Sequence, residues 1–175
     1  FPHPKGVIVA RLDGTVSLFG PKPISSKQVP GFVKNQWQVS CLGCNSQYTA
    51  VSVFITEAKK NRLYLLDCRL SLLTQSVDLG DLENAWSLDH PKTIKEVQMT
   101  LFVQSLHFVE RFKLPLILAN MIGQSLEVWA IHRRKLQRIL SRAFKFPNLV
   151  HIHPLDREIL VYHNAPYFKT FKFIV

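Results

Sequence analysis

Cysteine and histidine are the residues of this sequence whose spacing could hold a metal ion or support redox chemistry. Cys41 and Cys44 form a CxxC pair, Cys68 stands alone, and His151 and His153 form an HxH pair. A structural zinc site needs four ligands, and a redox CxxC needs a helix N-terminus that lowers the thiol pKa. Because residues 37–46 have the pattern of strand and loop, and HxH is typical of one strand face, we expect neither chemistry. The sequence predicts three reduced cysteines, no metal ion and no cofactor.

Motifs of catalytic sites are not found in the sequence. A nucleophile elbow, a phosphate-binding glycine loop, a dinucleotide glycine motif, an HExxH zinc motif and an EF-hand loop are all missing. The twelve acidic residues are scattered. Asp13, Asp67 and Asp156 have the surroundings of turn or strand-end residues that bind nearby backbone amides. We therefore expect no catalytic residues and a protein that is not an enzyme.

Basic residues are concentrated in one short segment. Its members are Arg133, Arg134, Lys135, Arg138 and Arg142, in a chain whose formal net charge is +10. Such a segment suits either the phosphates of a nucleic acid or the acidic surface of another protein. We expect a solvent-facing, partner-binding surface here, with other protein subunits as the partners and nucleic acid as the alternative.

The composition indicates a folded, β-rich domain. Apolar residues make up 47% of the chain and charged residues 19%, which excludes a disordered protein. Twelve Phe, four Tyr and three Trp suit β-sheets, in which aromatic side chains pack well. No apolar run approaches the roughly 18 residues of a transmembrane helix, so no membrane span is expected. The chain opens FPHPKG without the features of a signal peptide, and we expect an intracellular protein of the nucleus or cytoplasm.

Alternation of apolar and polar residues predicts strands along most of the chain. Residues 7–19 and 114–131 each predict a hairpin with a glycine turn, and residues 48–79 predict a meander of three strands. Further strands are expected at residues 37–42, 149–153, 158–162 and 167–175. The apolar phases of these strands predict a core that includes Phe19, Val53, Leu65, Trp129 and Val161.

Two segments fit both a strand and a helix. In residues 93–112, alternating apolar residues favour a strand, although helical spacing is also present. In residues 132–145, Leu136, Ile139 and Leu140 give a helical stripe, and the other interpretation is a turn followed by an outer strand. A mostly β fold of antiparallel meanders is the main prediction, and an α+β fold with helices in these two segments is the alternative.

The predicted hairpins share a pattern in which a turn is followed by a strand that ends on aliphatic and aromatic residues. It occurs as ARLDGTVSLF (10–19) and ANMIGQSLEVW (119–129), and more loosely as TEAKKNRLYLL (56–66) and PLDREILVY (154–162). This pattern resembles the blades of WD-repeat-like β-propellers, in which each blade is a four-stranded meander. The GH and WD dipeptides of that family are absent, so the resemblance is to a degenerate propeller. It implies one β-rich domain over residues 1–175, of about four blades, or a fragment of a larger propeller.

Two hypotheses about function follow from the resemblance and from the charge. A degenerate propeller implies a non-catalytic scaffold, a subunit of a multi-subunit complex that binds other proteins through its loops and strand edges. The alternative is a nucleic-acid-binding domain in which residues 133–145 form a basic helix against phosphates. Whether this segment is a helix or a strand separates the two hypotheses.

Overall fold

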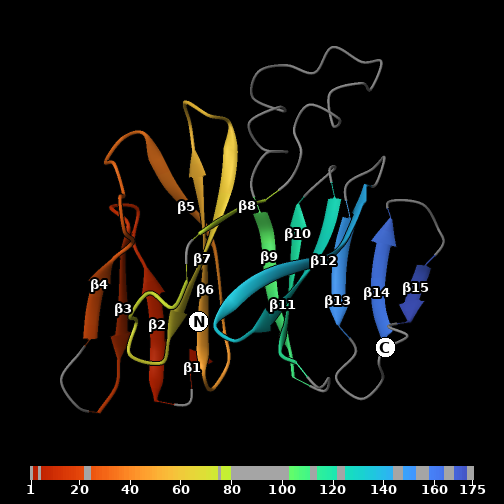
Figure 1. Ribbon diagram of the computed structural model, residues 1–175, viewed down its shortest axis with the longest axis horizontal. Coiled ribbons are helices and arrows are strands. Elements are labelled where there is room, and N and C mark those ends of the chain that lie inside the picture. Colours follow the sequence, from red (N-terminus) through yellow and green to blue (C-terminus); the bar gives the residue numbers. More distant parts are fainter. Residues whose placement is uncertain are drawn as a thin grey trace.

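Four antiparallel sheets follow one another along the chain (Figure 1). The structure is a computed structural model that describes residues 2–3, 5–21, 25–74, 76–79, 103–110, 114–121, 125–143, 148–152, 158–163 and 168–172. The first sheet contains β1 (Pro2–His3), β2 (Gly6–Ala10), β3 (Thr15–Phe19) and β4 (Ser25–Gln28). The second sheet contains β5 (Trp37–Cys44), β6 (Tyr48–Ile55), β7 (Lys60–Asp67) and β8 (Val77–Leu79). The third sheet contains β9 (Val103–Val109), β10 (Leu116–Met121), β11 (Ser125–His132) and β12 (Lys135–Ala143), and the fourth contains β13 (Asn148–Ile152), β14 (Glu158–His163) and β15 (Phe168–Lys172).

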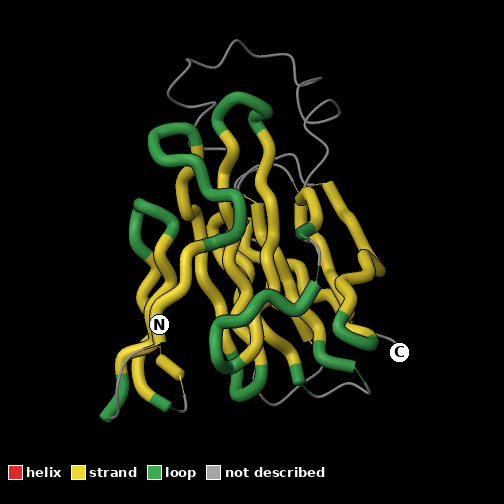
Figure 2. The backbone as a smooth tube through the Cα atoms, turned by 60° about the vertical axis from the view of Figure 1, so that its left-hand side comes forward, coloured by secondary structure: helices red, strands yellow, loops and turns green. Residues whose placement is uncertain are grey.

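Each sheet is a meander, because its strands are hydrogen-bonded to one another in chain order. Figure 2 shows strands and connecting loops, and no helix, in the part of the chain that the structure describes. The predicted mostly β fold of antiparallel meanders is therefore confirmed. Within the same residues, no helix is long and apolar enough to cross a membrane.

The alternative α+β fold is wrong where the two ambiguous segments are described. Residues 103–109 form β9, and residues 135–143 form β12, which pairs with β11. β12 contains a bulge: Leu136 pairs with Ile131 and Leu140 pairs with Val128, because the register shifts between Val128 and Trp129. Residues 93–102 lie outside the described part of the chain.

The first apolar core, core I, lies between the first and second sheets. Ile8 and Val16 of the first sheet pack with residues of β6 and β7 in the second sheet. The alternation of a strand decides this contact, since Val51 and Val53 of β6 enter core I and Ala50 points to the other side of the sheet. The loop glycine Gly14 also belongs to this region, because its φ of 80° and the Phe32 ring beside it leave no space for a side chain.

The second apolar core, core II, lies between the second and third sheets. Its members are Ala50, Leu63, Leu65, Leu79, Val103, Leu106, Ile117, Ala119, Met121, Trp129 and Ile131. The edge strands β5 and β9 meet beside this core, and a side chain added at Gly43 would lie 2.7 Å from the carbonyl oxygen of Leu106. Glycine at this position therefore permits the close approach of the two sheets. The central strands β6 and β7 of the second sheet therefore have buried residues on both faces.

The predicted core is partly confirmed. Val53, Leu65 and Trp129 are buried, as expected from the apolar phase of their strands. Phe19 is only half-buried, because it pairs with Val7 on the face of the first sheet that points away from core I. Its predicted burial is therefore wrong, and the inward phase of β3 belongs to Val16. The side chain of Val161 lies outside the part that the structure describes.

Candidate interaction site

The hairpin of β11 and β12 ends in a two-residue turn made of two arginines. Its strands pair as far as His132 and Lys135, so Arg133 and Arg134 form the loop. Their φ angles are 49° and 63°, which places both residues in the left-handed conformation. Such a loop favours Asn-Gly or Asp-Gly, because the left-handed conformation costs most other residues about 1–2 kcal/mol each. Two bulky cations therefore occupy positions for which turn chemistry favours asparagine and glycine.

The cations at this turn face solvent. Arg133, Arg134 and Lys135 are exposed, and none of them forms an ion pair with a carboxylate among the residues that the structure describes. We call these three residues the basic tip. Adjacent like charges without a neutralising carboxylate raise the local positive potential, which attracts anionic groups and speeds their association.

Arg138 has a different environment, although it lies on the same strand as Lys135. Its Nη1 is 3.6 Å from Oε1 of Glu127, whose side chain is only 1% exposed. Oε2 of this carboxylate accepts a hydrogen bond of 2.9 Å from Nε1 of Trp129, and the Arg138 guanidinium lies 5.9 Å from the centre of the Trp129 ring. A buried carboxylate needs a paired charge and hydrogen-bond donors. Arg138 therefore stabilises the third sheet as well as facing solvent.

The predicted partner-binding residues therefore do not form one cluster in the structure. The basic tip brings three of them together, whereas Arg138 covers Glu127 with a side chain that is 49% exposed. Arg142 lies on β12, and its side chain is outside the described part. Sequence reasoning missed the contact with Glu127. The signal that could have found it was a lone glutamate within the apolar run 126–129.

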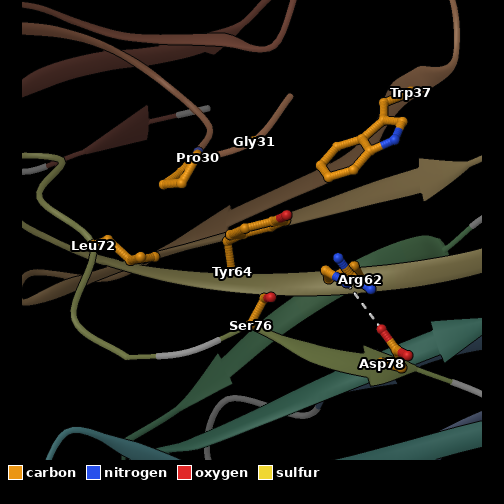
Figure 3. Close-up of a pocket in the computed structure, with 8 residues that line it drawn as sticks. All are labelled: Pro30, Gly31, Trp37, Arg62, Tyr64, Leu72, Ser76 and Asp78. Carbon is orange, nitrogen blue, oxygen red and sulfur yellow. Dashed lines mark hydrogen bonds and ion pairs between the residues drawn. The ribbon is translucent and has the colours of Figure 1, made fainter. Parts of the chain in front are cut away.

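A hollow of about 690 Å³ lies against the second sheet and the link that follows the first sheet (Figure 3). It is lined by Pro30, Gly31, Trp37, Arg62, Tyr64, Leu72, Ser76 and Asp78. Its volume is within the range of small-molecule pockets, about 300–1,000 Å³. No residue of this hollow was predicted as a site, because the lining comes from separate strands and loops that share no sequence motif.

The charges in the hollow neutralise each other. Nε of Arg62 donates a hydrogen bond of 3.0 Å to Oδ1 of Asp78, shown in Figure 3, and Nζ of Lys60 lies 4.0 Å from Oδ2. This hydrogen bond is the main cause that raises the pKa of Arg62 above its usual value. The Arg62 guanidinium also lies 5.9 Å from the centre of the Trp37 ring. With its arginine already paired, the hollow presents a mixed lining, in which polar groups of Arg62, Ser76 and Asp78 lie beside aromatic and apolar side chains.

The two thiols of the CxxC pair are on opposite sides of one sheet. Cys41 packs against core II, and Cys44 packs against core I. Burial raises the pKa of both thiols, so both favour the protonated form. In this strand the two sulfur atoms cannot bind the same metal ion. Of the HxH pair, His151 lies on β13, and His153 is outside the described residues.

Two of the three aspartates assigned to turns have the predicted role. Oδ1 of Asp13 accepts a hydrogen bond of 2.9 Å from the backbone amide of Thr15, which lowers the pKa of Asp13. Oδ1 of Asp67 accepts hydrogen bonds from the backbone amides of Arg69 and Ser71, both 2.8 Å. These two carboxylates therefore stabilise their own turns by accepting hydrogen bonds from backbone amides. Asp156 lies outside the described residues.

Comparison with known proteins gives information about the fold. No family model matches this sequence, and no curated protein matches it. The fold is similar to a crystal structure of the computationally designed Ika8 protein, with a TM-score of 0.57 and 11% sequence identity. The similarity covers 94% of this chain and 42% of the designed chain, so this chain spans less than half the length of that protein. The shared feature is the arrangement of the sheets.

Proposed function

We propose that this chain is a non-catalytic protein-interaction scaffold, a propeller-type subunit of a multi-subunit intracellular complex, which binds an acidic surface of another subunit through the basic tip. The observation that carries the proposal is the Arg133-Arg134 turn, in which two exposed cations occupy strained backbone positions. Strained residues that persist in a structure often belong to functional sites.

The sheet arrangement supports a propeller-type scaffold. Consecutive antiparallel meanders pack face to face in chain order, with core I and core II between the first three of them. Propeller blades are four-stranded meanders of this kind. Three four-stranded sheets and one sheet with three described strands agree with the proposal of about four blades.

The basic tip suits an acidic partner better than the hollow does. In the hollow, Asp78 already neutralises Arg62 and lies near Lys60. A partner carboxylate would have to compete with Asp78 for the same guanidinium. At the basic tip, the cations have no such competitor among the described residues. An exposed cluster of this type raises the rate of association and makes it sensitive to salt.

The basic helix required by the nucleic-acid hypothesis is absent, because residues 135–143 form a strand. An arginine-rich helix can enter the major groove of DNA, whereas the tip of a single hairpin presents few charges to phosphates. Protein carboxylates are therefore the proposed ligands. Binding to duplex DNA remains an outcome that the experiment below can detect.

Fluorescence anisotropy with labelled poly-L-glutamate and a duplex of about 20 base pairs tests the proposal. The variant Arg133→Glu/Arg134→Glu reverses the tip, and Lys27→Glu/Lys34→Glu makes the same charge change at two exposed lysines elsewhere. We expect the tip variant to lose at least tenfold in affinity for poly-L-glutamate at low salt, and the control to lose much less. Equal losses in the two variants would contradict the proposal. Tight duplex binding that only the tip variant abolishes would replace it with the nucleic-acid hypothesis.

A further inference from the structure

β12 is an edge strand with one free side. It is the last strand of the third sheet, and it pairs with β11 from Lys135 to Ala143, with a bulge at Ile139. It has nine residues, which correspond to about 30 Å of extended chain. No other described strand lies along its outer side. Among the described residues, no strand pairs with its outward N–H and C=O groups, which can therefore pair with another extended chain.

The other edges of the first three sheets are short or covered. β1, β4 and β8 contain only two, four and three residues, respectively. β5 and β9 are longer, but they pack against each other where the second and third sheets meet. Among the described edges of these sheets, β12 is therefore the long one that is open.

The side chains near this edge select the chemistry of the added strand. The basic tip lies at one end of β12, and Arg138 is half exposed. Ile139 occupies the bulge of the strand, and it is 52% exposed. These positive charges repel the same edge of a second copy and attract carboxylates. An aliphatic side chain in the added segment can cover Ile139.

We infer that β12 binds an extended acidic segment of a partner protein, which adds to the third sheet as a further strand. The inference rests on the proposed function, because the same basic tip attracts the partner. Backbone hydrogen bonds to Lys135–Arg138, the regular stretch before the bulge, hold the segment. Side chains then provide specificity: carboxylates face the basic tip, and an aliphatic residue covers Ile139. This is peptide recognition by strand addition.

The probe is a fluorescein-labelled peptide of about eight residues that alternates glutamate and valine, with both ends blocked. Two further peptides, isomers of each other, are methylated at backbone nitrogens: one at every glutamate, the other at every valine. Outward hydrogen bonds recur at every second residue of a docked strand, so at least one isomer blocks them. We expect that isomer to bind at least tenfold more weakly than the parent peptide. Equal affinity of the parent and both isomers would overturn strand addition.

Hydrogen exchange of the full chain gives an independent measurement. Peptide binding should slow exchange at amides between Lys135 and Ile139, and leave the edge strand β4 unchanged. The variant Ile139→Thr keeps a β-branched residue, and it should weaken the parent peptide without unfolding the sheet. Protection that is absent from β12 would overturn the inference.

The two proposals can fail separately. If Arg133→Glu/Arg134→Glu weakens poly-L-glutamate binding while N-methylation and exchange show no effect, the acidic-partner function stands and strand addition is wrong. If this variant has no more effect on poly-L-glutamate than Lys27→Glu/Lys34→Glu does, the proposed function itself fails. If poly-L-glutamate binds but the unmethylated parent peptide does not, strand addition is also overturned.

Discussion

Replacing the Arg133-Arg134 turn by Asn-Gly should stabilise the protein and weaken its binding to acidic partners. Both arginines are left-handed, with φ angles of 49° and 63°. Asparagine tolerates this conformation and glycine adopts it freely, so the variant Arg133→Asn/Arg134→Gly relieves most of the strain. The hairpin register should not change, because the loop keeps its two residues between His132 and Lys135.

The size of the effect follows from the backbone. The left-handed conformation costs about 1–2 kcal/mol for each ordinary residue. Glycine also increases the entropy of the unfolded chain, which offsets about 0.5–1 kcal/mol of the gain. The two positions together, less this offset, give an expected rise in the free energy of unfolding of about 1–3 kcal/mol. For a protein of this size, each kcal/mol raises the Tm by about 2–4 °C.

Urea unfolding at about 0.5 M NaCl measures the change, since high salt screens repulsion among the cations of the basic tip. The control Arg133→Lys/Arg134→Lys keeps the charges and the strain, and it should have the stability of the natural chain. An unchanged or lower stability of the Asn-Gly variant would show that the turn is not strained. Higher stability together with weaker binding to poly-L-glutamate would show that the arginines are kept for binding at the expense of stability.

Three further predictions concern the interior of the sheets. Arg138→Ala should lower the free energy of unfolding by about 1–3 kcal/mol in urea titrations, because the buried carboxylate of Glu127 loses its ion pair. A change below about 0.5 kcal/mol would mean that water solvates this carboxylate as well as the arginine does. Gly43→Ala should destabilise by about 1–3 kcal/mol in the same assay, because the added Cβ would lie 2.7 Å from a backbone oxygen of β9. The alkylation rate of Cys41 should still be rising with pH at the ordinary thiol pKa of 9.0 and level off only above it, because burial raises its pKa; rapid alkylation at neutral pH would contradict the burial.

Turn chemistry made the hairpins predictable from the sequence. Asp13-Gly14 marks the turn between β2 and β3, and the structure has Gly14 at positive φ and Asp13 bound to the amide of Thr15. Alternation was equally informative for β6, where Val51 and Val53 share one phase and enter core I, whereas Ala50 is on the other phase and enters core II. Local sequence carries these signals, since turns and strand periodicity depend on neighbouring residues.

Features that depend on distant residues were not predictable. The inward phase of β3 was misjudged at Phe19, because either phase contains apolar residues and only the position of the second sheet selects one. The bulge in β12 was not visible in the sequence, because it depends on how this strand pairs with β11. For the candidate site, the cluster of cations was visible, but the ion pair of Arg138 depends on the pairing of β11 with β12.

The second sheet contributes side chains to both apolar cores, and this arrangement affects the cooperativity of unfolding. Ala50 and Leu65 contribute to core II, whereas Val51 and Leu66, their neighbours in the chain, contribute to core I. In a stack of units with nearest-neighbour contacts, the stability of each unit is the sum of its own free energy and that of its interfaces. The second sheet has an interface on each side, whereas the first sheet has one among the described residues. Local unfolding should therefore begin at the first sheet, and the strands β6 and β7 should be among the last to open.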